Sequence, residues 1–340
     1  ADRAGKSDKR PPASSPEQPC RGVAKDAAAP RPESTAPMAD PVERPAPRPQ
    51  NALLAACWVL GAAGSFILMM ISVREMTTSM SSFQVLSFRS IVGIPIMCLV
   101  AWHMGFRNIR TRRPVMQVSR NVIHFGGQWC WVIGITLLPM AHVTALEFTM
   151  PMWTAVIAML FLGEKAKSHR ILAVIMGLAG VLVILRPGIE IVTGGALVVL
   201  LGALFYGTSN VMMKSLTADD APWVIVFWMQ VIQLPLSLGP AVFWFEWVWP
   251  DWPDAPWLLA IGITGMTAHF CLARAFQLAD ATVCIPIDFV RLPLAALVGW
   301  LFYAEGVSVW VLLGALLIFG GNYYSVWRET RSGKPAPGNA

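Results

Sequence analysis

Between residues 52 and 327 the chain is a succession of apolar runs of about 20 residues, separated by short polar loops. A helix of about 20 apolar residues can cross the hydrocarbon core of a bilayer, which is about 30 Å thick. Charged residues make up only 14% of the 340 residues and hydrophobic residues 55%, whereas a soluble domain has about 25% charged residues. Soluble enzymes and nucleic-acid-binding domains are therefore disfavoured, despite the net charge of +6. The sequence predicts an all-α integral membrane protein with ten transmembrane helices, over about 52–73, 83–104, 120–139, 142–162, 170–187, 194–214, 222–247, 257–278, 281–303 and 307–327.

Two of the predicted connections are very short, at residues 138–141 and 278–280. An alternative count merges the runs on either side of them into fewer, overlong helices. Pro139 and Asp280 disfavour that count, because each would lie unsupported within a membrane helix. We therefore expect a helical hairpin at both places.

Residues 1–50 differ in composition from the rest of the chain. They contain 11 of the 26 prolines and show no apolar periodicity. Such a segment cannot bury enough apolar surface to offset the entropy lost on ordering, so we expect a disordered cytoplasmic tail. It lacks the apolar core of a signal peptide, and we hypothesise that translation starts at Met38. A second cytoplasmic tail is expected over 331–340.

The positions of Lys and Arg predict the orientation in the membrane. With an even number of helices, the loops after the second and fourth helices lie on the same side as both termini. The opposite side carries the segment 244–257, whose five tryptophans suit an interfacial aromatic belt. We expect a multi-pass protein of the cytoplasmic membrane with both termini in the cytoplasm. The basic residues on that side are Arg107, Arg110, Arg112, Arg113, Lys165, Lys167, Arg170, Arg328, Arg331 and Lys334.

The sequence repeats itself after 141 residues. Cys130 then falls on Cys271, and the string Leu160-Phe161-x-Gly163-Glu164 falls on Leu301-Phe302-x-Ala304-Glu305. Residues 51–188 and 193–330 therefore form two copies of one five-helix unit. An odd number of helices in each copy inverts the second copy relative to the first, which is a recurrent architecture of secondary transporters.

These motifs resemble the EamA type of the drug/metabolite transporter superfamily, whose members have two inverted five-helix repeats. The resemblance rests on Pro151 followed by 160–164, the glycine-rich run 177–184, and their second copies at Pro293, 301–305 and 314–321. The Phe88-Arg89 pair also matches an Arg found in that family. The resemblance covers about 51–328 and implies transport of a metabolite, without naming the substrate.

Ionisable residues inside a bilayer cost at least about 2.5–3.5 kcal/mol each, so each is a candidate functional residue. The 141-residue shift organises them, because Glu147 falls on Asp288, Gln128 on His269, and Arg89 on Gln230. An acid at the same place in both copies is a sharper signal than either acid alone. The candidate substrate-binding or proton-coupling residues are Arg89, His124, Gln128, Glu147, Gln230, His269, Arg274, Asp288 and Arg291.

Two interpretations of these residues remain open. In the first, Arg89–Glu147 and Arg274–Asp288 are structural ion pairs, and Asp288 also pairs with Arg291 at the i,i+3 spacing. In the second, the charged groups surround a central water-filled cavity, where they bind a polar substrate or exchange a proton. His124 and His269 are candidates for a proton relay because neutral imidazole titrates near physiological pH.

Other conspicuous residues have simpler interpretations. Glu164 and Glu305 are expected to organise helix ends and loops. The glycines of spans 5 and 10 are expected to allow close helix packing. For the aromatic residues Trp131, Trp153, Tyr206 and Trp228 we expect core packing or contact with lipid, and lining of a cavity is the alternative. The scattered cysteines and histidines form no metal-ligand spacing, so we expect no metal and no cofactor.

The sequence thus predicts a secondary transporter that moves a small polar metabolite, such as an amino acid, by alternating access. Uptake of a larger compound such as S-adenosylmethionine or riboflavin is the alternative. No ATP-binding motif is present, so a gradient or exchange would supply the energy. A membrane-embedded enzyme and a sensor are weaker alternatives. The expected partners are a small-molecule substrate and the lipid bilayer; nucleic acid is not expected, and a homodimer is left open.

Overall fold

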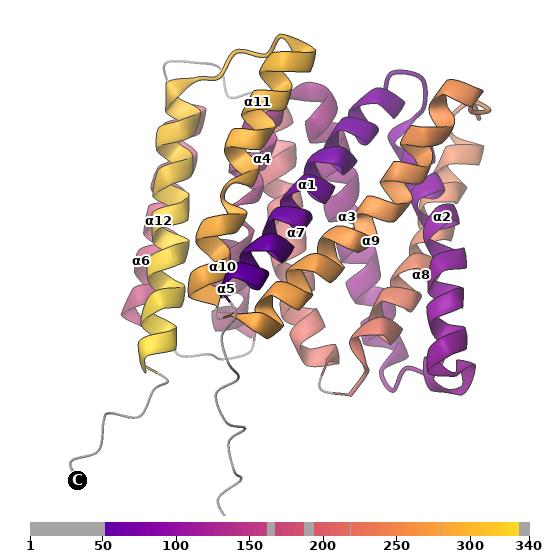
Figure 1. The fold of residues 1–340 in the computed structure, drawn as a ribbon, viewed down its shortest axis with the longest axis horizontal. Helices are drawn as coiled ribbons and strands as arrows, with labels where there is room; N and C mark the ends of the chain where they lie inside the picture. The colour runs from indigo at the N-terminus through magenta and orange to yellow at the C-terminus, as the bar shows by residue number, and fades with distance from the viewer. Residues whose placement is uncertain (1–51, 162–166, 187–193, 218, 280, 333–340) are drawn as a thin grey trace, which may run out of the picture. The chain divides into compact units, whose positions relative to one another are not determined.

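The computed structural model describes residues 52–161, 167–186, 194–217, 219–279 and 281–332. Within these ranges it is helical, with short turns and no strand. The predicted N-terminal tail lies outside the described residues. The α-helices are α1 (Ala52–Met76), α2 (Ser82–Met104), α3 (Pro114–Leu137), α4 (Met140–Glu147), α5 (Met150–Phe161), α6 (Ser168–Leu185), α7 (Gly194–Leu216), α8 (Pro222–Phe243), α9 (Ala255–Leu278), α10 (Ala281–Asp288), α11 (Arg291–Tyr303) and α12 (Val309–Ser332), with 3₁₀ turns η1 (Phe106–Ile109) and η2 (Trp252–Asp254) (Figure 1).

The predicted membrane fold is confirmed. Among the described residues nine helical segments are long and apolar enough to cross a bilayer, with α4–α5 and α10–α11 each serving as one segment. Helix α3 is the tenth predicted span. It is 24 residues long, but polar side chains reduce its hydropathy, and these are buried against protein rather than exposed to lipid.

The fourth and ninth spans are not the continuous helices that the sequence predicted. Each is interrupted for two residues, at Phe148-Thr149 between α4 and α5 and at Phe289-Val290 between α10 and α11. Proline lacks an N–H and its ring clashes with the carbonyl four residues earlier, so Pro151 and Pro293 disfavour a continuous helix at these points. The spans predicted over 142–162 and 281–303 are present, each as two helices joined at a two-residue break.

The two interruptions are equivalent in the repeat. Adding 141 to the bounds of α4 gives the bounds of α10, and Pro151 lies one position from the equivalent of Pro293. The carbonyl of Phe148 accepts a hydrogen bond from Asn322 Nδ2 of α12 at 2.9 Å. An irregular backbone at membrane depth requires such partners, because lipid cannot supply them.

The helix pairs follow the inverted repeat. Helix α1 packs along α9 and α7 packs along α3, while α2 packs on α8 and α6 on α12. The 141-residue shift converts the α1–α9 pair into the α7–α3 pair. Each helix of one copy therefore packs mainly against the other copy, so the two copies interlock and share one core.

Small residues set the distance between α6 and α12, as the glycine pattern predicted. A Cβ on Gly180 would lie 2.5 Å from the carbonyl oxygen of Gly314, and a Cβ on Gly314 would lie 2.5 Å from that of Gly180. Ala173 and Gly321 make the equivalent contact, because the shift converts 173–321 into 314–180. The crossing is thus self-complementary, as a pseudo-two-fold axis requires.

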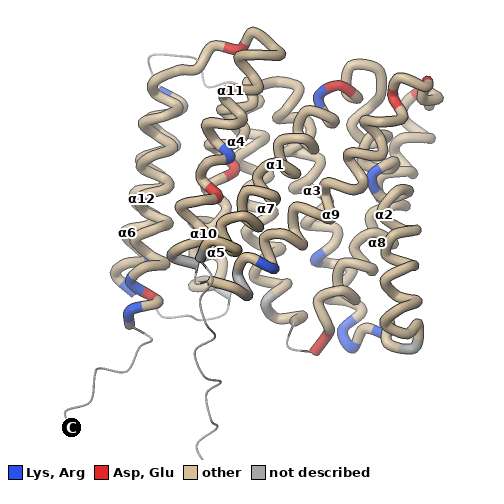
Figure 2. Tube along the Cα trace, in the orientation of Figure 1, with Lys and Arg blue, Asp and Glu red and all other residues tan. Residues whose placement is uncertain are grey.

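Two further features bear on the predicted membrane boundaries. The predicted span 222–247 ends earlier, at Phe243, because the tryptophan-rich segment leaves the helix; Trp249 and Trp252 are highly exposed. Lys and Arg gather at the end of the molecule where α6 begins and α12 ends (Figure 2).

Candidate functional site

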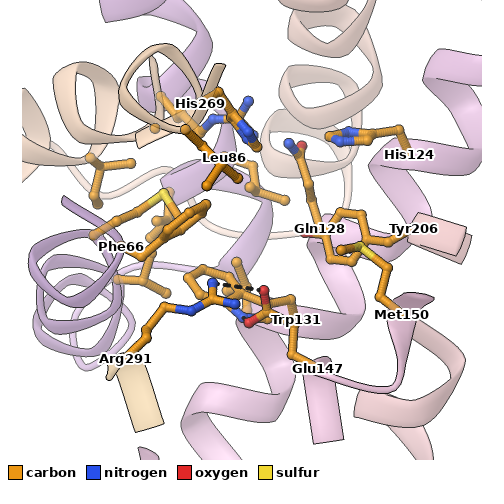
Figure 3. Close-up of a pocket in the computed structure, with 18 of the residues that line it drawn as sticks. Phe66, Leu86, His124, Gln128, Trp131, Glu147, Met150, Tyr206, His269 and Arg291 are labelled. Carbon is orange, nitrogen blue, oxygen red and sulfur yellow. Dashed lines mark hydrogen bonds and ion pairs between the residues drawn. The ribbon is translucent and has the colours of Figure 1, made fainter. Parts of the chain in front are cut away.

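A cavity of about 260 Å³ lies between the two copies, next to both helix interruptions. Cavities with an apolar lining and a few convergent polar groups are the usual sites of small-molecule binding. Helices of both repeats contribute to its wall (Figure 3). Seven of the nine predicted site residues line it: Arg89, His124, Gln128, Glu147, His269, Asp288 and Arg291.

The other two predicted residues lie elsewhere. Gln230 is buried between α8 and α2, where a Cβ on Gly93 would lie 2.8 Å from its side-chain amide. Arg274 is exposed on α9. Neither lines the cavity in this conformation.

The helix interruptions bring the acids together. Glu147 is the last residue of α4, Asp288 the last of α10, and Arg291 the first of α11. Arg291 Nη1 donates to Glu147 Oε1 at 3.2 Å, and Arg291 Nη2 lies 3.8 Å from Asp288 Oδ2. One arginine of the second repeat therefore contacts an acid of each repeat, one positive charge against two negative ones. Figure 3 shows its pair with Glu147.

This arrangement replaces two of the ion pairs that the sequence suggested. In the described part of the chain, Glu147 pairs with Arg291 rather than Arg89, and Asp288 pairs with Arg291 rather than Arg274. Only the i,i+3 pair of Asp288 and Arg291 was predicted correctly. The physical reason is that α4 packs against α11, which is a contact between the two repeats.

Aromatic rings hold Arg291 in place. Its guanidinium lies 4.6 Å from the ring centroid of Phe66 and 4.8 Å from that of Phe148. Trp131 Nε1 donates to Glu147 Oε2 at 3.0 Å, so the carboxylate is bound from both sides. Cation–π contacts with desolvated arginines are worth about 2 kcal/mol. The ion pair is thus held by contacts on both of its partners at the cavity wall.

Arg89 has a different environment from Arg291. Its side chain is buried, at 7% exposure, and lines the cavity. Within the described residues its guanidinium has no hydrogen bond and no carboxylate partner. A buried charge is normally paired, so Arg89 is a donor available to a ligand in the cavity. Helix α9 approaches it closely because Gly265 has no side chain; a Cβ there would lie 3.4 Å from Arg89 Nε.

Neutral polar groups form the remaining polar part of the wall. His124 Nδ1 lies 3.0 Å from Gln233 Nε2 of α8, and its ring meets the edge of Tyr206 at a centroid distance of 5.2 Å. His269 packs edge-on against Phe66 at 5.6 Å. Gln128 lies beside Tyr206 (Figure 3). These groups can donate and accept hydrogen bonds across the cavity.

Sequence reasoning placed part of the wall only as an alternative. Trp131 and Tyr206 line the cavity and also pack against the core, so the expected core packing and the alternative both hold. A helical signal was available for Trp131, because it lies three residues after Gln128 and seven after His124 on the same face of α3. Phe66, Met150 and Asn210 also line the cavity. Arg120, which was not counted among the buried charges, is 2% exposed.

Glu305 has the structural role that we predicted for it. Its Oε2 accepts a hydrogen bond from the backbone N–H of Met140 at 2.8 Å, and the carboxylate forms an ion pair with Arg74. It therefore ties the start of α4 to the end of α11. Glu164, its counterpart in the first repeat, lies outside the described residues.

Comparison with known proteins identifies the family. The model of the EamA-like transporter family matches twice, over residues 53–186 and 193–327. The chain belongs to this family. The predicted resemblance is thereby confirmed, and the chain is a multi-pass membrane transporter of a small metabolite rather than an enzyme.

Several named relatives cover nearly the whole transporter. The chain is 29% identical over 295 residues to the riboflavin transporter of Rhizobium johnstonii, which covers 85% of this chain and 96% of that protein. It is 24% identical to the S-adenosylmethionine uptake transporter of Rickettsia felis, over 76% of this chain and 87% of that protein. It is 26% identical to the pseudopaline exporter CntI of Pseudomonas aeruginosa, over 76% and 90%. A solved crystal structure has the same fold, with a TM-score of 0.58 and 17% identity over 82% of this chain and 99% of that one.

Proposed function

We propose that this transporter carries a neutral metabolite with a flat heteroaromatic ring and several hydrogen-bond acceptors. Riboflavin is the representative of this substrate class. The observation that carries the proposal is Arg89, a buried guanidinium that has no hydrogen bond or carboxylate partner among the described residues, in a wall that also has several aromatic side chains. A guanidinium donates up to five hydrogen bonds and accepts none. It therefore suits the carbonyl and ring-nitrogen edge of a flavin. The relatives named riboflavin transporters support the same substrate class.

The pairing of the acids disfavours a cationic substrate. Arg291 contacts both Glu147 and Asp288, although Asp288 Oδ1 has no hydrogen-bond partner. With Arg89 the wall carries two positive and two negative formal charges, so it has no net charge. S-adenosylmethionine carries a sulfonium and an ammonium as well as a carboxylate, so it would bring two cationic groups to a wall whose acids already contact an arginine. This observation favours riboflavin over S-adenosylmethionine, although relatives of both names exist.

The walls of the cavity favour a flat ring over a small amino acid. Its volume of about 260 Å³ lies just below the range of about 300–1,000 Å³ for ligand pockets, so volume alone does not separate the two. Phe66, Trp131 and Tyr206 provide aromatic surfaces at its wall, and aromatic rings pack against such surfaces with specific geometry. We propose that the ring of the substrate packs between these side chains while its polar edge meets Arg89.

We propose transport by alternating access, with both termini in the cytoplasm. The cavity extends along α1, α2 and α9 to Val73 and Val85, near the α1–α2 connection. Lys and Arg gather at the opposite end (Figure 2), which the positive-inside rule assigns to the cytoplasm.

Asp288 Oδ1 is buried without a hydrogen-bond partner, and we propose it as the group that exchanges a proton if transport is proton-coupled.

The test is uptake of radiolabelled riboflavin by a riboflavin auxotroph that expresses the chain, compared with S-adenosylmethionine and amino acids. Saturable riboflavin uptake is expected, with competition by flavins and not by S-adenosylmethionine. Arg89→Gln is expected to reduce uptake at least about tenfold, because a hydrogen bond to a charged group contributes about 1.5–3 kcal/mol. Arg274→Gln, an exposed arginine away from the cavity, is the matched control. Transport of S-adenosylmethionine or an amino acid alone would refute the riboflavin proposal.

A further inference from the structure

The half of α3 that precedes the cavity has an unusual buried face. Gln117, Arg120, Asn121 and His124 lie at spacings of three and four residues, so they share one side of the helix. Their exposed fractions are 1%, 2%, 0% and 8%. This face packs against α7 and α8. A polar stripe therefore runs from the cavity toward the loop between α2 and α3, where protein now covers it.

Many polar atoms along this stripe lack partners. In the part of the chain that the structure describes, Arg120 donates to Asn121 Oδ1 at 3.0 Å and to the sulfur of Met213 at 3.6 Å, and it meets no carboxylate. Arg120 Nε has no acceptor. Native proteins leave few buried polar atoms unpaired, so this region has groups that water or a ligand would satisfy. Gln117 Oε1 of α3 also lacks a partner, and on the two helices packed against α3 so do Ser209 Oγ of α7 and Gln230 Oε1 and Gln233 Oε1 of α8.

The inverted repeat indicates when those groups are satisfied. In this conformation the cavity reaches along α9 to Ile261, but along α3 it stops at His124. Subtracting 141 converts Ile261 into Arg120, Gly265 into His124 and His269 into Gln128. In carriers with inverted repeats the two copies exchange their conformations as the cavity opens to the other side. Arg120 would then line the cavity at the position in its own repeat that is equivalent to the present position of Ile261.

We propose that Arg120 lines the cavity when it opens toward the α2–α3 loop, and that it donates hydrogen bonds to the substrate there. The two halves of the transport path then differ in chemistry: one has Ile261 and the other a cation. Arg120 selects neutral, acceptor-rich or anionic molecules over cations in the second half. The substrate chemistry rests on the proposed function, whereas the exposure of Arg120 depends only on transport.

Cysteine labelling tests this exposure. Arg120→Cys, Asn121→Cys and Ile261→Cys are introduced separately into a functional chain whose six native cysteines have been replaced. A membrane-impermeant thiol reagent is applied to intact cells and to inside-out vesicles. Ile261→Cys is expected to react from one side, and Arg120→Cys and Asn121→Cys only from the other, with at least about tenfold preference. If Ile261→Cys reacts and the other two react from neither side, Arg120 stays packed and the proposal is wrong.

Ligand protection separates this proposal from the proposed function. Slower labelling of Asn121→Cys in excess riboflavin supports both. Labelling from the expected side without protection by riboflavin supports the path and contradicts riboflavin as substrate.

Substitution of Arg120 tests its contact with substrate. Arg120→Gln is expected to raise the KM for substrate applied on the α2–α3 loop side about tenfold or more, with a smaller change for the other side, and Arg120→Lys to restore part of the loss. Thermal unfolding in detergent shows whether each variant is folded. A folded Arg120→Gln protein with the wild-type KM on both sides would overturn the role of Arg120.

Discussion

Helices α3 and α9 occupy equivalent places in the two repeats, yet their buried faces differ chemically. The face of α3 carries Arg120, Asn121 and His124, while the matching positions of α9 are Ile261, Gly262 and Gly265. Both faces are packed inside the protein. An inverted repeat thus conserves geometry more strictly than chemistry. In a carrier, that difference makes the two entrances to one cavity unlike each other.

The helix interruptions likewise match in geometry and differ in chemistry. Both repeats break the span after the acid, at Glu147 and at Asp288. Only the second repeat begins the next helix with an arginine, because the equivalent of Arg291 is Met150. Arg291 therefore serves both acids, and the largest effect is expected when it is lost.

Arg291→Met copies the first repeat into the second and leaves two partly buried acids without a cation. Breaking a buried pair on one side costs about 3–5 kcal/mol, so we expect a large fall in thermal stability and loss of transport. The double variant Glu147→Gln/Arg291→Met should recover part of the stability. Unfolding in detergent measures both. Equal stability of the single and double variants would show that the pair between the repeats is not coupled.

An effect of intermediate size is expected at the crossing of α6 and α12. Gly180→Ala and Gly314→Ala each place a Cβ 2.5 Å from a backbone carbonyl of the partner helix, and overpacking of this kind costs about 1–3 kcal/mol. The two losses in unfolding free energy should be similar. Gly239→Ala is the control, since a Cβ there meets nothing within 4 Å. Clearly unequal losses would show that the two helices are not packed equally tightly at this contact.

The smallest effect is expected at Asn322, where the two repeats also differ. It donates to the freed carbonyl of Phe148, and its equivalent in the first repeat is Val181, which has no such group. Asn322→Ala should lower the free energy of unfolding by about 1 kcal/mol. Val181→Ala, as a small apolar truncation of similar size, is a useful comparison because it leaves both interruptions unchanged. No loss in Asn322→Ala would mean that this hydrogen bond does not stabilise the break.

The sequence was sufficient for the architecture, because apolar length and the 141-residue shift are local or periodic signals. It also placed seven residues around the cavity, since a charge in a membrane span must face protein or water. The interruptions at 148–149 and 289–290 escaped detection because a two-residue break leaves the apolar length of a span unchanged. The pairing of Glu147 with Arg291 depends on the packing of α4 against α11, which no spacing within one repeat encodes.

Arg120 shows a different limit. The predicted span begins at residue 120, and Arg120 was not among the candidate residues. Helix α3 in fact begins at Pro114, which places Arg120 within the protein. Polar residues at a helical spacing before His124 were the available signal, but their burial against α7 and α8 depends on the other repeat.

The most direct test of the central claim is to measure the binding of riboflavin to the purified transporter. The readout is the quenching of flavin fluorescence. Stacking of the flavin against the tryptophan and tyrosine rings of the cavity should quench it, so we predict saturable quenching by the wild-type protein. Affinity should fall at least about tenfold in Arg89→Gln, as expected for a lost charge-assisted hydrogen bond, and stay unchanged in Arg274→Gln. Absence of quenching, or equal affinity in folded Arg89→Gln, would contradict the account.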